Sequence, residues 1–105
     1  MSVYGPILTT TIASAGTSTD EIDLVHSYDF IQVSLPALDS CTIKIQTSFV
    51  TGGAFQDLGI DTLATVPTTG ERNSTFMIGG WQFIKIVVSA AQSAGRTITL
   101  RGGRY

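Results

Sequence analysis

Two side chains in this sequence could take part in covalent chemistry, the single histidine His26 and the single cysteine Cys41. A thiol nucleophile needs a base within hydrogen-bond reach, and His26 would have to supply it. His26 stands at the end of a strand-like segment, which favours a solvent-exposed position. Cys41 shares a strand face with Ile43 and Ile45, which is typical of a buried small hydrophobe. We therefore assign no catalytic residue and expect that the protein is not an enzyme.

Four carboxylates, those of Asp20, Glu21, Asp23 and Asp29, form a loose acidic group that could be compared with a calcium site. Calcium takes about six to eight oxygen ligands, often from closely spaced carboxylates in a loop that contains glycine. The spacing here matches no EF-hand loop, and strand alternation places Glu21 and Asp23 on the solvent side. We predict no metal site.

Two glycine pairs, Gly52-Gly53 and Gly79-Gly80, are candidates for phosphate-binding loops. Neither pair is followed by the lysine and hydroxyl residue that complete such a loop, and neither opens a helix. Both pairs are interpreted as tight turns, because glycine adopts a positive φ without a steric penalty. The sequence therefore indicates no cofactor.

Two aromatic residues near these turns, Phe55 and Trp81, could act as stacking platforms for sugar rings. The other interpretation of Trp81 is a place in the core or at its edge. An indole ring buries a large apolar area and keeps one polar group that can reach a partner. Both interpretations stay open for Trp81.

Aromatic, apolar and basic residues also gather near the two ends of the chain. Tyrosine and arginine are enriched among the residues that dominate binding energy at protein interfaces. The candidate contacts with a protein partner are Tyr4, Pro6, Ile7, Arg101, Arg104 and Tyr105.

The elements that must position these residues are strands, and residues 81–101 predict the two most prominent ones. Residues 81–90 are apolar on nearly both faces, with Lys85 as the exception. This pattern indicates a strand inside a sheet that is covered on both sides. Residues 97–101 alternate cleanly between apolar and polar side chains. The small, polar segment 89–95 is interpreted as a hairpin connection between the two strands.

Further strand-like segments are separated by turn signals roughly every 8 to 12 residues. They are 7–12, 20–27, 30–35, 41–49, 55–58, 61–66 and 75–78. In the segment 41–49, the odd-numbered residues, Phe49 included, are assigned to the core face. The total of eight or nine short strands predicts an all-β fold, a two-sheet antiparallel β-sandwich that is jelly-roll-like. A single closed barrel is the alternative.

The length of 105 residues favours one domain with one modest core. Residues 1–18 are interpreted as an N-terminal arm or edge strand, and residues 19–105 as a single β-sandwich domain. Charged residues make up only 13% of the chain. Because a free monomer usually needs more charge for solubility, this low fraction indicates that neighbours cover part of the surface.

The distribution of charge is more informative than the net charge of −2, which argues against a dedicated nucleic-acid or anionic-membrane binder. All eight acidic residues lie at or before Glu71, whereas five of the six basic residues follow it. One interpretation places acidic early strands beside basic late strands within one sheet. The other is an acidic patch and a basic patch that meet between subunits.

The lone cysteine excludes an internal disulfide, and nothing in the sequence indicates an oxidising compartment. The first ten residues lack the basic region and the apolar run of a signal peptide. No window approaches the ~18 apolar residues of a membrane span. We expect a protein that is made in a cytoplasm and assembled there, without contact with a membrane.

Four runs of sequence together resemble small β-sandwich virion structural proteins of tailed bacteriophages. They are TIASAGTSTDEIDL, FIQVSLPAL, CTIKIQTSFVTGGAFQDLG and FIKIVVSAAQSAGRTITLRG. The resemblance extends from about Thr11 to Gly102 and rests on a hairpin after TIKIQTS and on a late FIKIV strand before RTITL. The family hairpin usually carries an aspartate where this chain has residues 49–52.

Members of this group serve as capsid decoration (cement) proteins, as tail or baseplate components, and as carbohydrate-binding modules. The resemblance therefore implies a non-enzymatic virion protein that stabilises the head as a homo-oligomer, a trimer in the leading hypothesis. Its partners would be copies of itself and the major capsid protein or other virion proteins. The alternative is a carbohydrate-binding or structural module of the phage tail or baseplate.

Overall fold

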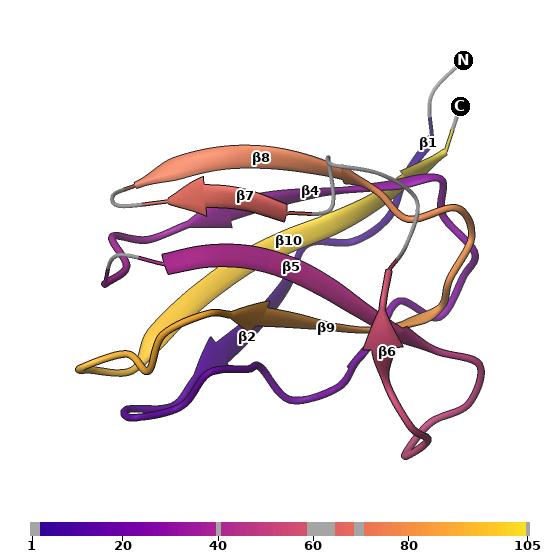
Figure 1. Cartoon of the computed structure of the whole chain (residues 1–105). Helices are drawn as coiled ribbons and strands as arrows, with labels where there is room; N and C mark the ends of the chain where they lie inside the picture. The colour runs from indigo at the N-terminus through magenta and orange to yellow at the C-terminus, as the bar shows by residue number, and fades with distance from the viewer. Residues whose placement is uncertain (1–2, 40, 59–64, 69–70, 105) are drawn as a thin grey trace.

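A computed structural model describes residues 3–39, 41–58, 65–68 and 71–104, with the backbone alone for residues 65–68 and 72. The described residues form ten strands (Figure 1). The strands are β1 Val3–Tyr4, β2 Leu8–Ile12, β3 Ile22–Asp23, β4 Phe30–Leu35, β5 Cys41–Ser48, β6 Gln56–Asp57, β7 Thr65–Thr68, β8 Arg72–Met77, β9 Phe83–Val88 and β10 Arg96–Arg104. The described part of the chain contains no helix that is long and apolar enough to span a membrane.

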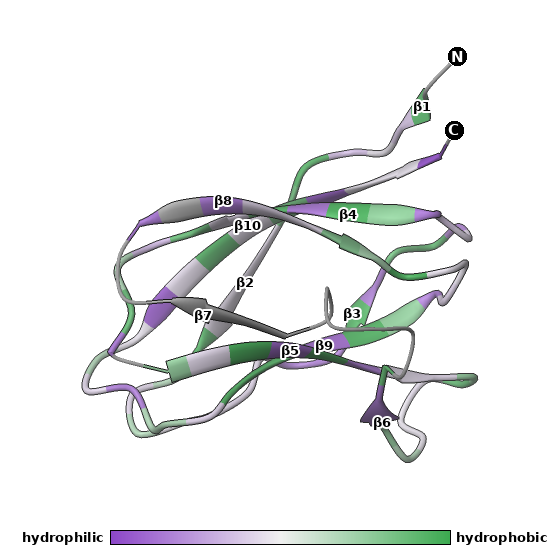
Figure 2. Ribbon diagram, turned by 45° about the horizontal axis from the view of Figure 1, so that its top comes forward, coloured by the Kyte–Doolittle hydropathy of each residue, from purple (hydrophilic) through white to green (hydrophobic). Residues whose placement is uncertain are grey.

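The strands form two antiparallel sheets that face each other (Figures 1 and 2). The first sheet has the order β1-β10-β4-β8, and β2 pairs with β10 on the same edge as β1. The second has the order β3-β9-β5-β6, and β7 pairs with β5 on the same edge as β6. The predicted all-β, two-sheet antiparallel sandwich is confirmed.

The connectivity is that of a jelly roll. β1 and β2 occupy one strand position along β10, and β6 and β7 occupy one position along β5. Counting each of these pairs as one strand leaves eight strand positions, numbered in chain order. They are arranged as 1-8-3-6 in one sheet and as 2-7-4-5 in the other. Two interleaved Greek keys of this kind define the jelly-roll architecture. The sequence predicted eight or nine strands, and the two-residue strand β1 is the described strand for which it indicated no segment.

The interior strand β9 pairs with β3 on one side and with β5 on the other. Ile84, Ile86 and Val88 are buried between the sheets, whereas the residues between them are half-buried. This confirms the prediction of an interior strand. The expected hairpin with residues 97–101 is wrong, because β9 and β10 belong to different sheets. The connection between them instead crosses from one sheet to the other.

The core fills the space between the two sheets with branched aliphatic side chains and one fully buried phenylalanine, Phe76. Alternation along β4 buries Ile31, Val33 and Leu35, as the sequence predicted. In Figure 2 green positions alternate with pale ones along the middle of β10, and the apolar residues Ile98 and Leu100 are buried on one face of the sheet. Burial of these side chains is the main stabilising contribution to a sandwich of this kind.

Strand β10 continues further than the sequence indicated, through Gly102 and Gly103 to Arg104. Both glycines lie under aromatic rings. A Cβ atom on Gly102 would lie 2.1 Å from the ring of Tyr28, and one on Gly103 would lie 2.4 Å from the ring of Phe30. The absence of side chains at these positions therefore lets Tyr28 close the end of the core and lets Phe30 pack on the other face of the sheet, against Tyr4.

Strand β5 ends earlier than predicted, and this changes the position of Phe49. Ser48 is the last strand residue, and the chain then turns through residues 49–53 with a positive φ at Gly52. The alternation that buries Thr47 therefore does not extend to Phe49, whose side chain is 84% exposed. The assignment of Phe49 to the core face is wrong.

Candidate functional site

The structure places His26 and Cys41 at opposite ends of the sandwich. His26 is exposed, with its ring edge-on to Tyr28 at 6.2 Å, next to the turn that precedes β9. Cys41 is buried at the first residue of β5, and the other end of that strand lies roughly 23 Å from it, at about 3.3 Å per residue. Burial raises the pKa of the Cys41 thiol above its ordinary value. The geometry does not assemble a nucleophile and a base from these two residues.

Two of the four carboxylates in the acidic group, those of Glu21 and Asp23, accept hydrogen bonds from other parts of the structure. Glu21 accepts hydrogen bonds from the Thr51 hydroxyl and from the Gly52 backbone N–H, the latter at 2.7 Å. Asp23 accepts hydrogen bonds from the Val25 backbone N–H at 2.8 Å and from the Gln82 amide at 2.9 Å. These donors lower the pKa values of both carboxyl groups below their ordinary values. Among the described residues, no group of three or more possible metal ligands is found.

The N-terminal and C-terminal candidates meet along β1 and β10, whose ends lie side by side (Figure 1). The guanidinium group of Arg101 lies 4.3 Å from the centre of the Tyr4 ring, a cation–π contact. Arg101 also donates a 2.7 Å hydrogen bond from Nε to Gln32 Oε1. Tyr4 in turn packs edge-on against Phe30 at 6.1 Å. Both side chains are thus held in place at the surface.

We call the five described residues of this region the terminal surface. It consists of Tyr4, Pro6, Ile7, Arg101 and Arg104. A hollow of about 290 Å³ is lined by three of them together with residues of the loop before β4. Tyr4 is 47% exposed and Ile7 is 68% exposed. The terminal surface therefore combines accessible apolar groups with arginine side chains. Tyr105, the sixth predicted contact, lies outside the described residues.

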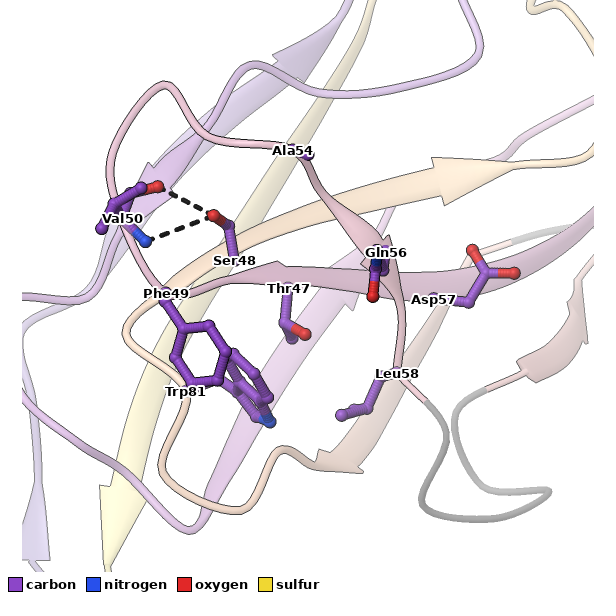
Figure 3. A pocket seen from close by; sticks show the side chains of 9 residues that line it. All are labelled: Thr47, Ser48, Phe49, Val50, Ala54, Gln56, Asp57, Leu58 and Trp81. Atoms are coloured by element: carbon purple, nitrogen blue, oxygen red, sulfur yellow. Dashed lines mark hydrogen bonds between the residues drawn. The ribbon is translucent and has the colours of Figure 1, made fainter.

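A second hollow, of about 580 Å³, lies beside the hairpin between β5 and β6 (Figure 3). The rings of Phe49 and Trp81 lie 4.6 Å apart at its side, inclined by 43°. Trp81 is half-buried and packs against the core, as one of its two sequence interpretations expected. The polar residues Thr47, Gln56 and Asp57 contribute to the lining. We call this region the aromatic hollow.

One of the two residues that the sequence predicted for sugar stacking lines the aromatic hollow. Trp81 lines it, whereas Phe55 lies outside it, with the Lys85 ammonium 4.6 Å from its ring centre. Phe49 takes the place that was expected of Phe55. The signal that could have found Phe49 is its position directly before the Val50–Gly53 turn, where the strand must end and side-chain alternation stops.

Hydrogen bonds fix the segment that carries Phe49. The Ser48 hydroxyl donates to the Val50 carbonyl at 2.9 Å, and the Val50 N–H lies 3.2 Å from the same hydroxyl oxygen (Figure 3). The Gly53 N–H donates to the Val50 carbonyl at 3.2 Å. Together with the two donors that contact Glu21, these bonds define the shape of the hairpin tip. The ring of Phe49 is therefore presented by a preorganised loop.

Charged residues from the two halves of the sequence pair within one molecule at one site. Arg96 Nη2 and Asp39 Oδ1 lie 3.0 Å apart. Next to this pair, the buried amide of Gln92 accepts a hydrogen bond from the Asp39 N–H at 2.8 Å and donates one to the Ala90 carbonyl at 3.0 Å. This network closes the end of the sandwich opposite the aromatic hollow. No feature of the sequence indicated that Gln92 would be buried.

Comparisons with known proteins establish a likeness in fold. No known family matches the sequence, and no curated protein matches it. The chain is similar to the crystal structure of the SPBc2 prophage-derived protein YomS, with a TM-score of 0.61 and 17% identity over 96% of this chain and 95% of that one. At this identity the likeness shows a shared fold.

Two weaker likenesses were also found. One is to a chain of the capsid asymmetric unit of cyanophage Pam1, with a TM-score of 0.42 and 12% identity over 94% of this chain and 84% of that one. The other is to a Bacillus endospore appendage from a family of disulfide-linked pili, with a TM-score of 0.38 and 16% identity over 99% of this chain and 89% of that one. Both TM-scores are too low to bear on fold or function.

Proposed function

We propose that this chain is a non-enzymatic structural protein of a bacteriophage virion. In this proposal it is a capsid decoration (cement) protein that binds the head as a homotrimer and contacts the major capsid protein. The jelly-roll fold that it shares with a prophage-derived protein supports a phage origin. The burial of Cys41, far from the exposed His26, supports a role without covalent chemistry.

The observation that carries the proposal is the Tyr4–Arg101 contact within the terminal surface. Both residue types are frequent at the energetic centres of protein interfaces. Here each is held by further contacts, so binding would cost little side-chain entropy. Ile7, which is 68% exposed and directly precedes β2, offers an apolar group that a partner could cover.

The mechanism is burial of surface against neighbouring subunits. A stable interface buries about 800 Å² on each partner. The described chain exposes 5604 Å², so one such contact would cover roughly a seventh of it. Two contacts per subunit within a trimer, and a third with the head, remain compatible with a small domain. The low charge of the chain fits a protein whose surface is largely covered in this way.

The experiment compares Ile7→Asp with Val50→Asp. Both substitutions place a carboxylate on an exposed apolar position, 68% and 59% exposed, and only the first lies on the terminal surface. Each variant is mixed with purified heads that lack this protein, and co-sedimentation is measured. Native mass spectrometry gives the oligomeric state of each variant.

We expect Ile7→Asp to abolish co-sedimentation and Val50→Asp to retain it. If both variants sediment with heads as the original chain does, the terminal surface is not the contact. Binding to isolated tails or baseplates, without binding to heads, would replace the cement role with that of a structural module of the tail or baseplate.

A further inference from the structure

We propose that the aromatic hollow binds a neutral carbohydrate, with one pyranose ring stacked on the Phe49–Trp81 pair. This site is separate from the terminal surface and does not depend on the proposed role in the virion. It would give the protein a binding activity of its own in addition to its contacts with neighbouring subunits.

The ring pair provides a surface of suitable shape. The two ring centres are 4.6 Å apart and the rings are inclined by 43°, so Phe49 partly covers Trp81 and the pair forms one apolar surface rather than two separate patches. Phe49 is 84% exposed, which is unusual for a phenylalanine in a soluble domain and leaves much of its ring available. A pyranose ring has one face of C–H groups, and these can pack on an aromatic face.

Polar groups stand where the hydroxyls of such a ring would lie. Figure 3 shows the ring pair on one side and Gln56 and Asp57 on the other, with Thr47 between them. An exposed glutamine amide offers both donors and an acceptor, and a hydroxyl or carboxylate oxygen offers further acceptors. A mixed lining of this kind, aromatic with a few polar groups, is typical of small-ligand sites.

The charge of the lining selects a neutral sugar. Asp57 is the charged residue among the described residues that line the aromatic hollow. It accepts hydrogen bonds from Gln46 and Lys44, which lower the pKa of its carboxyl group, so it is ionised at neutral pH. Lys44 Nζ lies 3.0 Å from Asp57 Oδ1, so this ion pair leaves the lining without an unpaired charge that would attract a charged sugar.

The size and rigidity of the hollow fit a small ligand. Its volume of about 580 Å³ lies within the range of about 300 to 1,000 Å³ that is usual for small-molecule sites. The hydrogen bonds around Ser48 and Val50, with those to Glu21, fix the loop before any ligand arrives. A preorganised site loses less entropy on binding.

The experiment uses the intrinsic fluorescence of Trp81, which is the only tryptophan in the chain. The full chain is titrated with a panel of neutral sugars, namely the methyl glycosides of glucose, galactose, mannose and N-acetylglucosamine, and with glucuronic acid as an acidic counterpart. We expect a saturable change in Trp81 emission with at least one neutral sugar and a weaker response to glucuronic acid. The absence of a saturable change with every neutral sugar would overturn the proposal.

Two substitutions test whether the sugar binds in the aromatic hollow or elsewhere on the surface. Phe49→Ala should weaken sugar binding by about tenfold, because losing an aromatic contact worth about 1.4 kcal/mol changes affinity by that factor. Phe55→Ala, which removes an aromatic ring from the same hairpin outside the hollow, should leave the affinity unchanged. Circular dichroism and thermal unfolding would check that both variants fold.

Equal binding by Phe49→Ala and the original chain would contradict the proposal. The proposal would also be contradicted if purified heads changed the Trp81 emission and none of the sugars did. The aromatic hollow would then be a contact with another protein.

Discussion

The backbone N–H of Gly52 donates a 2.7 Å hydrogen bond to the Glu21 carboxylate, across 31 residues of sequence. Glu21 precedes β3, and Gly52 lies in the hairpin between β5 and β6, at the opposite edge of the same sheet. A second donor, the Thr51 hydroxyl, reaches the other carboxylate oxygen. This side chain therefore connects the two edges of the sheet and holds the hairpin tip that presents Phe49.

The Glu21 contact should depend on pH. The hydrogen bonds from Thr51 and Gly52 lower the pKa of Glu21 in the folded protein below its ordinary value of 4.5. The contribution is therefore fully present above pH 4.5 and is lost as the pH falls through the lower folded pKa. The Gly52 amide resonance, followed by NMR from pH 7 to pH 2, should titrate with a midpoint below 4.5.

The control for this prediction is Glu21→Gln, which has no carboxyl group to titrate. In this variant the pH-dependent shift of the Gly52 amide should disappear. A midpoint at or above 4.5 in the original chain would contradict the hydrogen-bonding arrangement of the hairpin tip.

Gly102→Ala should destabilise the protein. The new Cβ atom would lie 2.1 Å from Cδ2 of Tyr28, whose ring is buried and cannot move away freely. We expect a loss of about 1 to 3 kcal/mol in the free energy of unfolding, as for other overpacked cores. Urea denaturation followed by Trp81 fluorescence would measure it. Gly95→Ala is the matched control, since its nearest neighbour would be the Ile12 carbonyl oxygen at 3.9 Å, and should change stability little.

Gln92→Leu should destabilise the opposite end of the sandwich. The substitution keeps the approximate size of the buried side chain but removes the partners of the Asp39 N–H and the Ala90 carbonyl. Leaving such groups without hydrogen bonds costs about 1 to 3 kcal/mol. Gln82→Leu removes an exposed amide that contacts Asp23, and should change the free energy of unfolding by no more than about 0.5 kcal/mol. Equal effects of the two substitutions would show that the Gln92 network does not stabilise the fold.

Cys41 should react slowly with iodoacetamide in the folded protein. Burial raises its thiol pKa and shields the sulfur atom, so little thiolate is available at pH 8. In urea the same thiol should react at the rate of an ordinary cysteine. Native labelling as fast as labelling of the unfolded chain, followed by mass spectrometry, would contradict the buried position and reopen a chemical role for Cys41.

The alternation of apolar and polar residues, together with the turn signals between segments, was sufficient to predict a two-sheet antiparallel sandwich. β4 alternates from Ile31 to Leu35 and β9 is apolar on nearly both faces, and each occupies an interior position of its sheet. The sequence could not show which strands pair, because a connection of seven residues is long enough either for a hairpin or for a crossing between sheets. Residues 89–95 form the crossing, closed by the buried amide of Gln92.

The candidate sites were predicted less completely than the fold. The residues of the terminal surface were chosen by type, and the β1–β10 ladder brings Tyr4 and Arg101 into contact, which no local pattern indicates. For the aromatic hollow, the sequence identified Trp81 but assigned Phe49 to the core. That assignment extended strand alternation by one residue past Ser48, where the Ser48–Val50 hydrogen bonds turn the chain instead.

The most direct test of the virion assignment is quantitative mass spectrometry of density-gradient-purified phage particles. If the chain is a capsid decoration protein, it should be present at a fixed ratio to the major capsid protein, and this ratio should persist in heads separated from tails. Particles that contain none of this chain, from lysates in which it accumulates as free protein, would contradict the assignment.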